Sequence, residues 1–69
     1  MKEIIFVVEE DPEGGYNAQA IGHSIFTEGE SLDELKENVK NALKCHFDKI
    51  EAPLFIRLHI VKEEKFAYA

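Results

Sequence analysis

The chain contains one cysteine, Cys45, which excludes an internal disulfide framework of the kind that staples small secreted proteins. It also lacks any apolar run near the roughly 20 residues that a membrane-spanning helix needs. No cleavage signature follows Met1, so we expect a protein without a signal peptide, located in the cytoplasm and not bound to a membrane. The length of 69 residues predicts a single small domain, residues 1–69.

Basic residues are in the minority, with 8 Lys and Arg against 14 Asp and Glu and a net charge of -6. Nucleic acids are bound mainly through Lys and Arg, so direct binding of nucleic acid is not expected. Three lysines, Lys36, Lys40 and Lys44, recur every four residues, which favours a solvated stripe over a phosphate site. The acidic charge instead favours a basic protein as partner, because opposite potentials speed encounter.

The first half of the chain has the pattern of three strands. Residues 3–10 are apolar on both faces at period two, which is typical of a central strand. The Asp11–Gly15 segment has the proline and glycines of a turn, and residues 16–20 then alternate small apolar with polar side chains. These segments predict a β-hairpin, followed by a short third strand at 25–27.

The second half predicts one helix and one more strand. Ser31 and Glu34 have the spacing of a capping box, and apolar residues follow at helical spacing, so a helix is expected from about 32 to 48. Alternating apolar residues predict a fourth strand at 54–61. The resulting fold is α+β, in the order β-β-β-α-β. Its four-stranded mixed sheet has strand order 3-2-1-4, and the helix packs on one face.

One helix covers only one face of a sheet, so the other face is expected to expose apolar side chains, among them Ile21. We therefore predict a homodimer.

The aromatic residues of the tail, residues 62–69, have two interpretations: they extend the last strand, or they cover the apolar face of a second copy. The predicted dimer interface comprises Ile5, Val7, Phe55, Val61, Phe66 and Tyr68.

Two groups of residues raise the question of catalysis or metal binding. The acids of the hairpin could supply oxygen ligands to a metal ion, but a solvated turn is the simpler interpretation of such a charge run. They are Glu9, Glu10, Asp11 and Glu13. Cys45 and His46 are neighbours on the predicted helix, where they diverge by about 100° and cannot face one ion or substrate. No catalytic, cofactor-binding or metal site is therefore expected, and the protein is not expected to be an enzyme.

The hairpin, the turn before the helix and the helix itself carry motifs that resemble a known family. These motifs are Asp11-Pro12-Glu13-Gly14-Gly15-Tyr16-x-Ala18, Thr27-Glu28-Gly29-Glu30-Ser31-Leu32-Asp33-Glu34-Leu35 and Asn38-Val39-x-x-Ala42-Leu43. Together they resemble the HicB-like antitoxin domain over about residues 3–61. The turn-and-cap block at 27–35 is the most specific part of the resemblance.

The resemblance implies a partial ribonuclease-H-like fold and a non-enzymatic, protein-binding function. Known members of the family bind and occlude HicA toxins, which are small basic ribonucleases that cleave messenger RNA. The acidic hairpin is then expected to contact the toxin through Glu9, Asp11, Glu13 and Tyr16. Full-length antitoxins also carry a C-terminal DNA-binding domain, for which these 69 residues leave no room, so operator binding is not expected.

Two other functions stay open at this point. The chain could be an orphan dimeric HicB-like scaffold that has no toxin partner. It could also be a metal-dependent nuclease that uses the acids of the hairpin, although similarity to a ribonuclease-H-like fold does not carry activity by itself.

Overall fold

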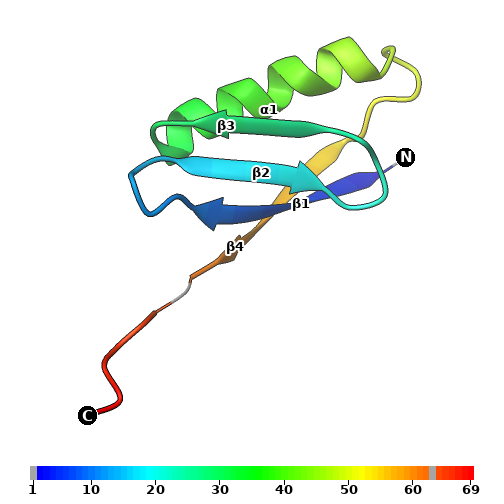
Figure 1. Ribbon diagram of the computed structural model, residues 1–69. Coiled ribbons are helices and arrows are strands. Elements are labelled where there is room, and N and C mark those ends of the chain that lie inside the picture. The colour runs from blue at the N-terminus through cyan, green and yellow to red at the C-terminus, as the bar shows by residue number, and fades with distance from the viewer. Residues whose placement is uncertain (1, 63) are drawn as a thin grey trace.

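The computed structural model describes residues 2–62 and 64–69, which form an α+β fold with one sheet and one helix (Figure 1). The elements are β1 (Glu3–Glu10), β2 (Tyr16–Ala20), β3 (Phe26–Gly29), α1 (Leu32–His46) and β4 (Phe55–Val61). The sheet has the order β3-β2-β1-β4. Its β1–β2 and β2–β3 pairs are antiparallel, and β4 is parallel to β1. The predicted fold class and strand order are confirmed.

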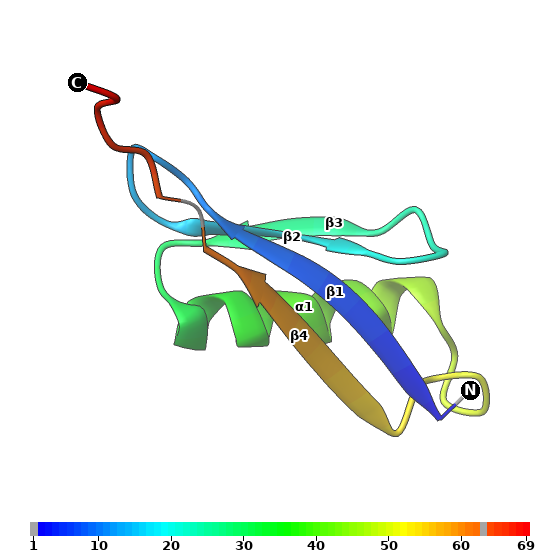
Figure 2. The same ribbon diagram turned by 90° about the horizontal axis from the view of Figure 1, so that it is seen from below.

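The ends of some elements differ from the sequence-based expectation. Helix α1 ends at His46 rather than near residue 48, because Phe47 adopts an extended conformation (φ -119°). The interpretation that the tail extends the last strand is wrong, since the described residues after Val61 form no strand. Figures 1 and 2 show this tail, drawn in red, pointing away from the body of the molecule. No helix within the described residues is long and apolar enough to cross a membrane.

The core lies between α1 and the face of the sheet that it covers. Alternate residues of the central strands point to this face, and every third or fourth residue of the helix meets them. The buried side chains are Ile4, Phe6, Val8, Ala18, Ala20, Ile25, Leu35, Val39 and Leu43. The small alanines of β2 allow the helix to lie close to this strand.

The start of α1 is fixed by its cap. The Glu34 amide donates to Ser31 Oγ (3.1 Å), and the Leu35 amide donates to the Ser31 carbonyl oxygen (2.9 Å). The reciprocal bond of the predicted capping box, from the Ser31 amide to the Glu34 carboxylate, is not among the hydrogen bonds of the described residues. Ser31 therefore acts as a simple N-cap, which satisfies an amide that the first turn of the helix would leave unpaired.

Gly29 lets this first turn pack directly on the end of β3. A Cβ atom at position 29 would lie 2.6 Å from the Leu35 amide nitrogen and 2.9 Å from Leu35 Cα. Backbone atoms cannot yield as a flexible side chain would, so a larger residue must push the helix away from the sheet. The glycine of the turn motif is thus required by close packing between backbone segments.

The helix covers only part of its side of the sheet. No Cα atom of α1 lies within 8 Å of one in β1 or β4, whereas the helix approaches β2 and β3 this closely. A helix with its side chains is about 10 Å across, and neighbouring strands are about 4.8 Å apart, so one helix cannot shield four strands. Ile56, Leu58 and Ile60 share the helix side with the buried residues of β1, but they are partly or largely exposed.

The opposite face of the sheet, called the outer face below, carries both apolar and polar side chains. Arg57 pairs with Ile5, and His59 pairs with Val7, so basic and polar side chains interrupt the apolar residues along β4. The Arg57 Nε atom also lies 2.6 Å from a carboxylate oxygen of Glu3. Apolar side chains are nevertheless exposed on this face, as predicted, at both ends of β4.

The remaining predicted outer-face residues lie beside both polar and apolar neighbours. Phe55 pairs with Glu3 and Val61 pairs with Glu9, which places each beside a carboxylate at one end of β4. Ile21 is exposed on the far side of β1, next to Ile5. These residues are therefore interleaved with polar side chains, and their role in a dimer interface stays a prediction.

We expect Gly29→Ala to lower the free energy of unfolding by about 2 kcal/mol, because the added methyl group collides with the backbone of α1. Urea denaturation followed by circular dichroism measures this loss. Gly22→Ala is the matched control, since Gly22 has φ +81° but nothing within 4 Å of its Cβ position. Its loss should stay near 1 kcal/mol; equal losses for the two variants would contradict the packing explanation.

Candidate protein-binding surface

The hairpin turn between β1 and β2 is held by its own backbone. The Asp11 amide donates to the Gly15 carbonyl and the Gly14 amide to the Asp11 carbonyl, both at 2.9 Å. The Glu13 amide donates to Asp11 Oδ1 at 2.9 Å, which is the hydrogen bond of an Asx turn. Gly14 and Gly15 have φ values of 108° and 84°, which favour glycine. The turn therefore presents its acids in a defined loop.

Three segments bring carboxylates to the same end of the molecule as this turn. Tyr16 pairs with Gly29, so the start of β2 lies beside the end of β3, and α1 begins just beyond. The eight carboxylates of these segments are all exposed and form what we call the acidic end: Glu9, Glu10, Asp11, Glu13, Glu28, Glu30, Asp33 and Glu34. Sequence reasoning identified the hairpin acids but missed those contributed by β3 and α1.

Two hollows flank the turn. The smaller, of about 210 Å³, lies between the turn and the start of α1, and its lining includes Asp11, Glu30 and Glu34. The larger, of about 620 Å³, lies between the end of β1 and the tail, where Lys62 and Lys65 face the hairpin acids. Both hollows are open to solvent at the surface.

The four predicted contact residues lie at the acidic end but do not share one face. Glu9 pairs with Asn17 and belongs to the outer face, whereas Tyr16 belongs to the helix side. Tyr16 is half-buried and packs against the core, so part of its ring has a structural role. Glu13 and Asp11 lie in the turn and are exposed. The surface that these residues offer is therefore mainly one of carboxylates.

Asn38 joins the helix to the acidic end. Its Nδ2 atom donates to the Glu28 carbonyl oxygen at 2.7 Å, so the side chain pairs a backbone acceptor on β3, an edge strand of the sheet. This contact gives a physical reason for the asparagine of the helix motif. It holds α1 against β3, and thereby keeps the acids of α1 close to those of the hairpin.

The second group considered for catalysis, Cys45 and His46, lies at the opposite end, near the end of α1. The rings of His46 and Phe47 pack edge-to-face, with centroids 4.7 Å apart. The His23 ring lies 5.3 Å from that of Phe47 and 6.0 Å from that of His46. Cys45 is exposed beside this cluster. Within residues 2–62 and 64–69, no group of three His, Cys, Asp or Glu side chains is arranged to hold a metal ion.

The structure is a small α+β domain with exposed carboxylates gathered at one end. Comparison with known proteins places it in a family. The UPF0150 protein of Thermotoga maritima is 42% identical over 66 residues, which cover 96% of this chain and 93% of that protein. The UPF0150 protein of Archaeoglobus fulgidus is 58% identical over 50 residues, or 72% of this chain and 74% of that protein. The chain belongs to the UPF0150 family.

No family model matches the sequence. No solved structure matches it either.

We expect Asn38→Asp to lower the free energy of unfolding by about 1–2 kcal/mol, because a carboxylate cannot donate to the Glu28 carbonyl and adds charge near the acidic end. Asn41→Asp makes the same change at an exposed position of α1 and should cost less than about 0.5 kcal/mol. Urea titrations at low and high salt measure both. Equal destabilisation would show that the loss reflects only the added charge on the helix.

Proposed function

We propose that this chain is a HicB-like antitoxin that binds a small, basic HicA-type toxin and covers the surface with which the toxin cleaves messenger RNA. The motifs that carry the resemblance have defined structural roles. Gly29 allows contact between backbone segments, Ser31 caps α1 and Asn38 ties α1 to β3. The resembling residues therefore build the scaffold of the acidic end, which supports a common architecture with the HicB-like domain.

The observation that carries the proposal is the acidic end itself. Eight exposed carboxylates from three segments converge there, whereas only Lys62 and Lys65 of the basic residues line the adjoining hollows. A protein that cleaves RNA must hold phosphate groups with basic side chains. The carboxylates of the acidic end compete with RNA phosphates for the basic side chains of the toxin. Their negative potential also speeds the encounter of the two proteins.

The proposed inhibition is occlusion, in which this chain makes and breaks no covalent bond. The turn is held by two backbone hydrogen bonds and one to the Asp11 carboxylate, and the helix start by two more, so the carboxylates are presented on a firm frame. Binding then loses little entropy from ordering the backbone of this surface. Such a preformed surface can cover an RNA-binding site on the toxin.

We expect Glu9→Lys combined with Glu13→Lys to weaken binding to a HicA-type toxin encoded beside this chain by at least about tenfold near 0.1 M salt, because four units of charge change at the contact. Asp11 is left intact, since its carboxylate holds the turn. Isothermal titration calorimetry measures the affinity, and cleavage of a messenger RNA by the toxin measures inhibition.

Glu37→Lys combined with Glu51→Lys is the matched control, because it changes the charge equally at exposed positions away from the acidic end. The control should bind like the parent chain, and high salt should reduce the difference between the two variants. Unchanged binding by the Glu9 and Glu13 variant would show that the acidic end is not the contact. Absence of binding by the parent chain itself would favour the orphan scaffold.

A further inference from the structure

The free side of β4 combines an open strand edge with an uncovered apolar face. The Phe55 amide donates to the Lys2 carbonyl, so in this parallel pair the alternate residues 55, 57, 59 and 61 bond to β1. The amides of Ile56, Leu58 and Ile60 therefore point to the open edge, while their side chains point to the helix side. Such an edge is a template for pairing with another strand.

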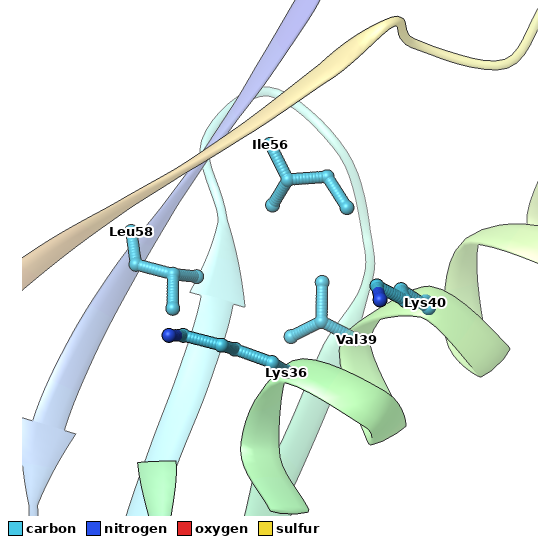
Figure 3. A pocket seen from close by; sticks show the side chains of 5 residues that line it. All are labelled: Lys36, Val39, Lys40, Ile56 and Leu58. Carbon is cyan, nitrogen blue, oxygen red and sulfur yellow. The ribbon is translucent and has the colours of Figure 1, made fainter. Parts of the chain in front are cut away.

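A groove runs beside this face, between β4 and α1. The part of the groove near the middle of β4, of about 180 Å³, is lined by Lys36, Val39, Lys40, Ile56 and Leu58 (Figure 3). Its continuation toward the end of α1, of about 450 Å³, has apolar walls from Leu43, Phe47, Ala52, Pro53 and Ile56. The stripe of lysines on α1 thus borders an apolar groove, where their aliphatic stems add to its walls.

The tail carries side chains that match this groove. Phe66 and Tyr68 have the same parity as Ile56, Leu58 and Ile60, so an extended tail places all five on the helix side. In the single chain the tail points away from the body (Figures 1 and 2), and Phe66 and Tyr68 are 85% and 104% exposed. The tail cannot reach the groove of its own chain while it leads away from it.

We propose that a second copy of this chain occupies this surface, with the two β4 strands paired antiparallel about a two-fold axis at Leu58. The pairing joins two sheets into one of eight strands and gives the outward amides of β4 their partners. With Leu58 facing itself, Ile56 of one copy faces Ile60 of the other. Ile56, Leu58 and Ile60 of both copies then form one apolar strip between the two helices.

The same axis directs each tail to the groove of the other copy. Phe66 follows Leu58 by eight residues, so an extended tail carries it past the start of β4 in the other copy to the turn that holds Ile50. Ile50 is 93% exposed in the single chain. Phe66 and Tyr68 meet the wider part of the groove there, next to Phe47 and Pro53.

Charge complementarity favours this antiparallel arrangement. Parallel pairing would bring the two acidic ends together, with mutual repulsion. Antiparallel pairing instead sets the acidic end of one copy toward the end of the other that carries Lys2, Lys44 and Lys49. Glu64, on the helix side of an extended tail, comes beside the lysines that border the groove.

Sedimentation equilibrium over roughly 10 to 200 μM tests the proposal. The parent chain should have twice the 7.9 kDa chain mass. Ile60→Lys should raise the dissociation constant at least about tenfold, because the new charge lies in the apolar strip between the copies. Ile21→Lys, at a similarly exposed residue of the outer face, should leave the dimer unchanged. Phe66→Ser combined with Tyr68→Ser should also weaken it.

A cross-linking experiment keeps the test independent of how well these variants fold. In a Cys45→Ser background, Leu58→Cys should form a covalent dimer under oxidised glutathione, since facing residues of such a pair lie about 5.5 Å apart at Cα. Ile21→Cys in the same background should remain monomeric on denaturing gels. A parent chain that is monomeric throughout, or a dimer that Ile21→Lys dissociates and Ile60→Lys does not, would overturn the proposal.

Discussion

The close contact between α1 and the end of β3 determines the rest of this molecule. Gly29 allows the backbone of the helix to touch the strand, and Asn38 ties the next turn of the helix to the same strand. This contact fixes the helix over β3 and β2, at one side of a four-stranded sheet. It has two consequences: the start of α1 joins the hairpin at the acidic end, and β4 is left without a cover.

These two consequences give the molecule two surfaces of opposite character. The acidic end is built from exposed carboxylates and open hollows, and its negative potential attracts the proposed basic partner at longer range. The free side of β4 is apolar and has an open strand edge, which suits short-range contact with a matching strand. The proposed toxin and the proposed second copy therefore use different parts of the chain and can be tested separately.

The family relationship rests on sequence identity. The structure explains why particular positions of the motifs are glycines. Positive φ angles at Gly14 and Gly15 account for the glycines of the hairpin, and a backbone collision accounts for Gly29. Neither explanation refers to a partner. The proposed antitoxin function depends instead on the charge of the residues around these positions, such as Glu9 and Glu30, which the fold leaves free to vary.

The sequence alone determined the elements and their order, because alternation, helical spacing and the Ser31 cap are local signals that agree with one another. It also identified the hairpin acids, which are neighbours along the chain. Only the tertiary structure decided which other acids join them, since Glu28 and Glu34 reach the hairpin through strand pairing and helix packing. Ile56 and Ile60 stay uncovered because one helix is too narrow to cover four strands. This limit depends on the packing of the helix on the sheet, which local sequence patterns do not describe.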